Sequence, residues 1–123
     1  MKINKSQDIS VLELKIFKIK YLKFLTNKKN RDKKDILDCI EIEQMIEIFI
    51  SFLLKEKVNK LIEINDLILD KYLEYLLGAC LYDTGTYNIA KYTHINCLKN
   101  FFIWLIKKKF IKTEPFSKYN IIK

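Results

Sequence analysis

Glycine and proline are scarce in this chain, with two Gly and one Pro among 123 residues. An all-β protein of this length needs many tight turns, which depend on those two residue types. Their scarcity therefore favours helices. Half of the residues are hydrophobic, which is enough to bury the core of one domain, and the length also predicts a single domain.

Long hydrophobic runs are also missing. The longest are 48–54, interrupted by Ser51, and 101–106, far short of the ~20 residues that span a bilayer. Charged residues break up the N-terminal segment, so it does not have the form of a signal peptide. Cysteine is limited to Cys39, Cys80 and Cys97, an odd number without zinc-ligand spacing. We expect reduced, buried cysteines in a soluble cytoplasmic protein that needs no metal, cofactor or membrane.

Arginine is nearly absent, since Arg31 is one of 23 basic residues, yet the net charge is +8. Residues 1–34 hold 11 basic and 3 acidic side chains, residues 35–83 hold 4 and 11, and residues 84–123 hold 8 and 1. Two basic segments thus flank an acidic middle, which suggests a polyanion-binding face. The alternative is that the lysines only solvate ordinary helices and reflect an AT-rich coding sequence.

Four segments show the composition or the periodicity of helices. Their ranges are 9–27, 35–57, 63–77 and 86–109. The last three carry apolar residues at helical spacing, which predicts their buried faces. These faces comprise Ile42, Met45, Ile46, Phe49, Ile50, Phe52 and Leu53, then Leu69, Tyr72, Leu73 and Leu76, then Ile95, Leu98, Phe102 and Leu105. Short connections between four helices predict a compact all-α bundle.

Several residues mark the expected helix ends. Asp35, Thr86 and either Asn65 or Asp66 are suited to N-cap positions, where a side-chain oxygen accepts a hydrogen bond from a free backbone N–H. Gly78 is suited to end the third helix. Proline has no backbone N–H, so Pro115 excludes a helix beyond it.

The order of these parts is similar to one known family. The segments Ile64–Leu76 and Leu98–Leu105, the turn Asp83–Thr86 and the exit Glu114–Phe116 resemble the last two helices of the core-binding domain of tyrosine recombinases, or phage-type integrases. The segments Tyr21–Leu25 and Ile42–Leu53 resemble its earlier helices. The resemblance implies a SAM-like helical fold, with a tail at 1–9, the core-binding domain at 10–115, and from 116 the start of a linker to a separate catalytic domain.

The same resemblance implies that the chain holds double-stranded DNA for recombination or integration, where other recombinase protomers could bind beside it. The exposed residues expected on the first turns of the fourth helix are Lys91, Thr93, His94, Asn96 and Lys99. The connection before the second helix adds Lys28, Lys29, Arg31, Lys33 and Lys34. Lysines would contact phosphates, while Asn96 and His94 could reach base edges.

The chain departs from the family pattern at three places. Asp38, Glu41, Glu43 and Glu47 stand on the second helix where the family often has basic residues. Thr93 and His94 stand where the fourth helix of the family often has Arg, and Glu114 replaces an Asn before the proline. These departures predict either weak DNA binding or a different partner for this surface.

The residues required for catalysis are missing. Tyrosine recombination needs a nucleophilic Tyr with two Arg, a Lys and His-type residues around the scissile phosphate, but this chain has one Arg and one His. We therefore expect no enzymatic activity and no small-molecule substrate. His94 and Cys97 alone make a poor zinc site, and the carboxylates of the second helix are expected to form a solvated face.

Two further alternatives concern surfaces. Phe101, Phe102 and Trp104 could stack on bases, but at helical spacing we expect them in the core, with Trp104 off the main stripe. Apolar residues occur all around the first helix, which suggests a protein-interaction or oligomerisation module instead of a DNA-binding one. An acidic second helix meeting a basic fourth helix of another copy would drive such association.

Overall fold

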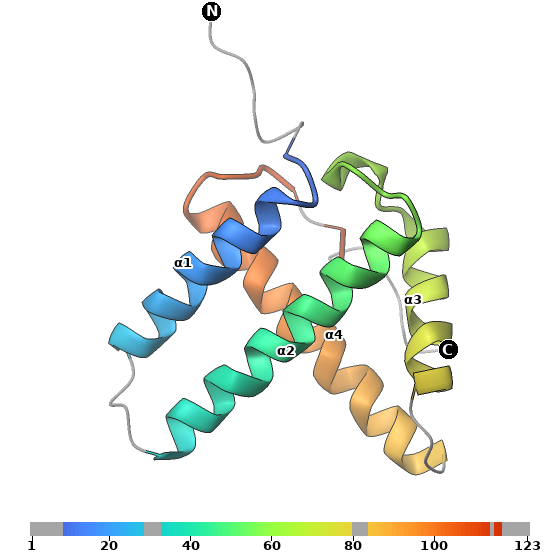
Figure 1. The fold of residues 1–123 in the computed structure, drawn as a ribbon, viewed down its shortest axis with the longest axis horizontal. Helices are drawn as coiled ribbons and strands as arrows, with labels where there is room; N and C mark the ends of the chain where they lie inside the picture. The colour runs from blue at the N-terminus through green and yellow to red at the C-terminus, as the bar shows by residue number, and fades with distance from the viewer. Residues whose placement is uncertain (1–8, 29–32, 80–83, 114, 117–123) are drawn as a thin grey trace, which may run out of the picture.

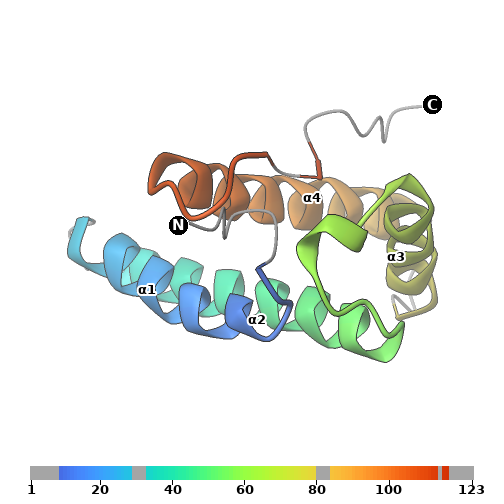
Figure 2. The same cartoon turned by 90° about the horizontal axis from the view of Figure 1, so that it is seen from above.

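Four α-helices form two layers in the computed structural model (Figure 1). It describes residues 9–28, 33–79, 84–113 and 115–116, with side chains over 9–27, 39–76, 93–113 and 115–116. The helices are α1 (Glu13–Lys28), α2 (Lys33–Lys55), α3 (Asp66–Ala79) and α4 (Thr84–Lys107), with a short 3-10 helix, η2 (Leu61–Glu63), before α3. Helices α1 and α2 make one layer, α4 lies across it, and α3 covers one end (Figure 2). The predicted all-α bundle is confirmed.

Local hydrogen bonds explain where α1 and α3 begin. The Ser10 backbone N–H donates to Glu13 Oε1 at 2.8 Å, and the Glu13 N–H donates to Ser10 Oγ at 3.1 Å. This reciprocal pair is a capping box, which places the start of α1 four residues later than the expected one. At α3, Asn65 Oδ1 accepts a hydrogen bond from the backbone N–H of Ile68 at 3.0 Å. Of the two expected candidates, Asn65 and Asp66, the N-cap residue is therefore Asn65.

Helix α1 ends one residue later than expected, and the remaining helix ends are shifted by two residues. Helix α2 begins at Lys33 and α4 at Thr84, so Asp35 and Thr86 lie inside helices, and α3 continues past Gly78 to Ala79. Helices α2 and α4 each end in a Schellman motif, in which the chain turns through a left-handed residue. Those residues are Lys57, with φ 64°, and Lys109, with φ 65°.

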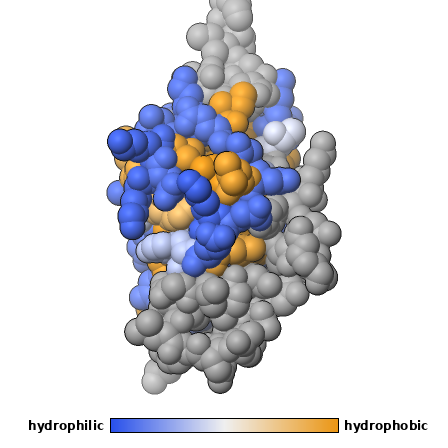
Figure 3. Space-filling model, turned by 90° about the vertical axis from the view of Figure 1, so that its right-hand side faces the viewer, coloured by the Kyte–Doolittle hydropathy of each residue, from blue (hydrophilic) through white to orange (hydrophobic). Residues whose placement is uncertain are grey.

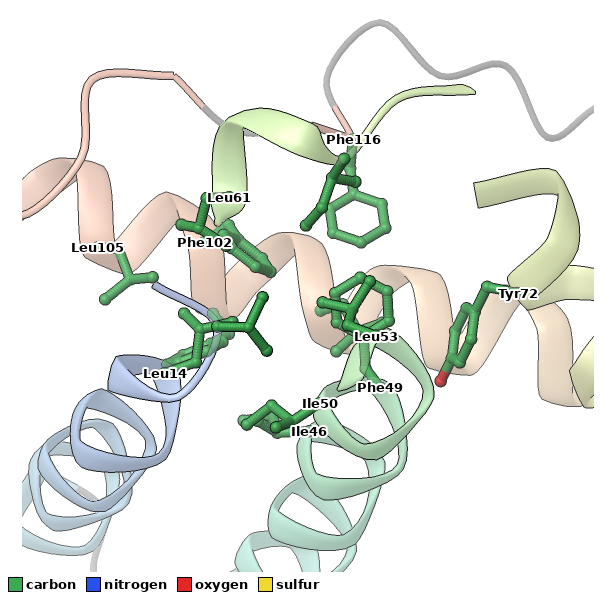
Figure 4. Close-up of a cluster of buried hydrophobic side chains, with 14 of the residues drawn as sticks. Leu14, Ile46, Phe49, Ile50, Leu53, Leu61, Tyr72, Phe102, Leu105 and Phe116 are labelled. Atoms are coloured by element: carbon green, nitrogen blue, oxygen red, sulfur yellow. The ribbon is translucent and has the colours of Figure 1, made fainter. Parts of the chain in front are cut away.

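A single hydrophobic core joins all four helices (Figure 4). The predicted stripes of α2, α3 and α4 all contribute to it, because their 3.6-residue period keeps one face inward. Phe49 of α2 is central, with its ring 4.9 Å from that of Tyr72 and 6.3 Å from that of Phe102 between centroids. The predicted core position of Phe101, Phe102 and Trp104 is confirmed, since all three are buried.

The core also includes both ends of the described chain. Ile9 is buried, and its carbonyl accepts the Leu61 N–H at 2.9 Å. Phe116 is buried too, with its ring centroid 5.7 Å from that of Phe49 and 5.5 Å from that of Phe102. The packed domain therefore includes residues 9 and 116, which the sequence had placed in a tail and a linker. No described helix is both long and apolar enough to cross a membrane.

Candidate nucleic-acid interface

Helix α4 keeps one long face open. Its exposed described residues recur at intervals of three and four, which places them on one side of the helix. They are Thr93, Asn96, Asn100, Ile103 and Lys107. The sequence of α4 contains no Asp or Glu over its 24 residues. Apart from Ile103, the open face is therefore polar or basic, and no carboxylate on this helix would repel a phosphate backbone.

The α4 residues that were expected to bind DNA fall into three groups according to the exposure of their side chains. Thr93 and Asn96 are exposed, as expected, and Lys99 is half-buried at the edge of the open face. Lys91 lies within α4, but its side chain is outside the described part of the structure. His94 does not match the expected exposed position, because it is half-buried and turned towards α3.

A hydrogen bond to Tyr72 holds His94 in this orientation. The Tyr72 hydroxyl lies 3.1 Å from His94 Nδ1, and the Tyr72 side chain is fully buried. Burial lowers the pKa of His94 below its ordinary value and raises the pKa of Tyr72, so both groups are neutral near pH 7. In this neutral pair the tautomer of the imidazole decides whether the phenol O–H or the Nδ1–H donates. In both cases the bond ties α3 to α4 rather than presenting His94 to a base.

The thiol of Cys97 lies near this pair and is half-buried. Burial raises the pKa of Cys97 to about 11, whereas a nucleophilic or metal-binding cysteine needs a lowered pKa. Among the described side chains, no group of three or more His, Cys, Asp or Glu residues could hold a metal ion. The α3–α4 contact is thus built as a structural junction.

The second predicted DNA-binding group lies at the connection between α1 and α2. Lys28 ends α1, while Lys33 and Lys34 begin α2; the side chains of these three residues and all of Lys29 and Arg31 lie outside the described part. In Figure 1 the last turn of α1 and the first turn of α2 are on the left, and the first turn of α4 is at the lower right. The described helix ends on either side of the connection therefore lie away from the first turn of α4.

A third basic region was not among the predicted site residues. Ring contacts hold the end of α4 and the loop after it against α1: Phe17 stacks on Phe110 at 4.5 Å, and Phe24 lies 5.9 Å from Trp104, between centroids. The exposed lysines close to this contact then form one basic edge. They are Lys20 and Lys23 of α1 and Lys107, Lys108, Lys109 and Lys112. The Lys107–Lys109 run was the available sequence signal, but its nearness to α1 depends on the tertiary packing.

The acidic residues of α2 are partly neutralised inside the chain. Lys18 of α1 is buried, and its Nζ lies 2.5 Å from Glu47 Oε2 and 3.4 Å from Glu43 Oε2. These two carboxylates therefore hold α1 against α2, while Glu41 and Glu43 are exposed as expected and Glu47 is half-buried. The side chain of Asp38 is outside the described part.

The aromatic residues of α4 do not offer a base-stacking platform, because their rings are inside the core. Trp104, expected to face a neighbouring helix, packs against Tyr21 and Phe24 of α1 at centroid distances of 5.2 Å and 5.9 Å. Its indole Nε1 is buried without a hydrogen-bond partner in the described structure.

Figure 3 shows the α3 side of the molecule, where hydrophobic surface is surrounded by hydrophilic surface. The exposed large hydrophobic side chains of η2 and α3 are Ile62, Leu67 and Tyr75.

No protein-family model, curated protein or solved structure matches this chain. Three surfaces of the chain itself bear on its function. These are the open face of α4, the basic edge and the exposed side of the α1–α2 layer.

Proposed function

We propose that this chain is a non-catalytic DNA-binding domain that grips duplex DNA through α4 and the basic edge. The observation that carries the proposal is the segregation of charge. Helix α4 has no acidic residue, and Glu13 is the single acidic side chain among described residues 9–27 and 93–113. Lysine-rich surfaces without carboxylates attract phosphates and release counterions on binding.

Within this proposal the open face of α4 supplies the recognition surface. Asn96 is exposed on it, and an asparagine side chain can donate to and accept from adenine at the same time. Thr93 and Asn100 are exposed on the same side, and Lys99 and Lys107 would contact phosphates. His94 contributes indirectly, by fixing the angle at which α4 leaves α3.

The resemblance to the SAM-like core-binding domain of tyrosine recombinases suggests the biological role of this DNA binding. In that form the chain clamps a core site in the cytoplasm, at the nucleoid, during recombination or integration. A separate catalytic domain would cut the DNA, and other protomers would bind beside it.

Binding of a short fluorescent AT-rich duplex, measured by anisotropy at about 50 and 200 mM salt, tests the proposal. We expect affinity to fall steeply with salt. The double variant Lys99→Ala/Lys107→Ala should weaken binding and flatten the salt dependence by up to about 0.9 per lost phosphate contact. The matched control is Lys60→Ala/Lys71→Ala, which removes the same charge from exposed residues outside α4 and the basic edge. Equal affinities for both variants, or no binding at the lower salt, would exclude the proposal.

A second candidate function is a helical protein-interaction or oligomerisation module. The observation that favours it is the exposure of three large aliphatic residues on one side of α1, namely Leu12, Ile16 and Ile19. Sedimentation of the chain without DNA separates the two candidates, because a stable oligomer that does not bind DNA favours the interaction module.

A further inference from the structure

The side of the α1–α2 layer that faces away from α4 carries two apolar stripes. On α1, Leu12, Ile16 and Ile19 are 59%, 56% and 56% exposed, and their spacing puts them on one face. On α2, Ile40 and Ile48 are 45% and 36% exposed. They are eight residues apart, with the exposed Gln44 between them, so they also share one face. We call these five aliphatic residues and their charged neighbours the outer face.

The charges beside the two stripes are opposite in sign. The α1 stripe is flanked by the exposed Lys15, Lys20 and Lys23, whereas the α2 stripe is flanked by the exposed Glu41 and the half-exposed Glu43 and Glu47. Helices α1 and α2 lie side by side in one layer (Figure 2), joined by the ion pairs of Lys18. One molecule therefore presents a basic apolar helix next to an acidic apolar helix.

We propose that the outer face binds a second copy of the same chain in a two-fold dimer. In this arrangement α1 of each copy packs on α2 of the other copy. The apolar stripe of α1 then contacts the apolar stripe of α2, and the lysines beside the first lie opposite the glutamates beside the second. A two-fold interface requires a self-complementary surface, and adjacent helices of opposite charge with matched apolar stripes satisfy that requirement. Helix α4 lies in the opposite layer (Figure 2), whereas Lys20 and Lys23 belong both to the basic edge and to the outer face, so the dimer is tested without DNA.

The dimensions of the outer face set the expected strength of the dimer. Helix α1 has 16 residues and α2 has 23, and two adjacent helices along the length of α1 cover roughly 500 Å² per copy at 1.5 Å rise and ~10 Å helix width. About 1,000 Å² in total is at the lower limit of specific interfaces. The expected dimer is therefore reversible, with a Kd in the micromolar range.

Sedimentation equilibrium of the full chain without DNA, from a few to several hundred micromolar, tests the proposal. We expect a monomer–dimer equilibrium that Ile16→Glu weakens at least about 30-fold, since Ile16 lies at the centre of the α1 stripe. The matched control is Ile62→Glu, because Ile62 is 65% exposed on η2, outside the outer face, and should leave the Kd unchanged. Circular dichroism of both variants verifies that they are folded. If Ile16→Glu fails to fold, Leu12→Lys takes its place, with the same expected loss of the dimer.

Charge reversal tests the pairing itself. Lys20→Glu/Lys23→Glu places new carboxylates opposite the glutamates of α2, and Glu41→Lys/Gln44→Lys places new lysines opposite the lysines of α1, so each double variant alone should dimerise more weakly than the wild-type chain. Mixed in equal amounts, the two variants should form a heterodimer, since each acidic helix then meets a basic one. Both reversals leave Lys18 and its two glutamates in place. A wild-type chain that stays monomeric throughout the concentration range, a dimer that survives Ile16→Glu, or a mixture that stays monomeric would overturn the proposal.

Discussion

At the residue scale, the Tyr72–His94 pair couples stability to pH. Burial lowers the pKa of His94 in the folded chain from the ordinary value of 6.5, so the unfolded chain binds the proton more readily. Its contribution to stability is then fully present above pH 6.5 and is lost as pH falls through the folded pKa. We expect the free energy of unfolding, measured by urea titration, to decrease between pH 7.5 and pH 5.5. In His94→Gln this decrease should be smaller, and an identical pH dependence in the variant would contradict the assignment.

Two lysines in left-handed conformations offer another residue-scale prediction. Lys57 and Lys109 have φ of 64° and 65°, where a residue with a Cβ is strained by roughly 1–2 kcal/mol and glycine is not. After the entropy that glycine loses on folding, Lys57→Gly and Lys109→Gly should each raise the free energy of unfolding by about 0.5–1 kcal/mol in urea titrations. Lys60→Gly is the control, because Lys60 has φ −128° and gains nothing from glycine. A loss of stability in both Schellman variants would refute the argument.

At the element scale, Lys18 decides how α1 packs on α2. Its ammonium is buried and held by Glu43 and Glu47, whose side chains are 48% and 36% exposed. Because water reaches both carboxylates, the ion pairs contribute modestly. Lys18→Met keeps the apolar stem but leaves two like charges one helical turn apart, which should cost about 1 kcal/mol in unfolding free energy. Lys18→Met/Glu43→Gln/Glu47→Gln removes that repulsion and should recover most of the loss. A triple variant less stable than Lys18→Met would show that the glutamates act in another way.

At the scale of the whole molecule, the sequence predicted what depends on periodicity and missed what depends on helix crossings. The stripes of α2, α3 and α4 were predictable, because repeating apolar positions define a buried face without knowledge of the partner. The inward turn of His94 requires the partner hydroxyl of Tyr72, 22 residues away. Burial of Lys18 requires two glutamates from α2, and that of Phe116 requires the packed ring of Phe49. No local sequence pattern predicts such contacts between distant residues.

The predicted DNA-binding set shows the same division. Thr93 and Asn96 were expected to be exposed and are exposed, since their positions on α4 follow from the stripe opposite them. The basic edge was missed because Lys20 and Lys108 are far apart in the chain. They come to one side of the molecule through the packing of Phe17 on Phe110 and of Phe24 on Trp104. A charge cluster that is assembled across helices has no signature in the local sequence.

The continuous core also predicts that the molecule unfolds as one unit. Trp104, the single tryptophan, is buried between α4 and α1, so its fluorescence reports the docking of α1. Leu69 lies in α3, at the other end of the domain, and is fully buried. Leu69→Ala should lower the free energy of unfolding by about 2–5 kcal/mol. In urea, the Trp104 fluorescence and far-UV circular dichroism transitions should shift together, as expected for a cooperative small domain. If the fluorescence midpoint stays at its wild-type value while the dichroism midpoint falls, α3 unfolds separately and the core is divided in two.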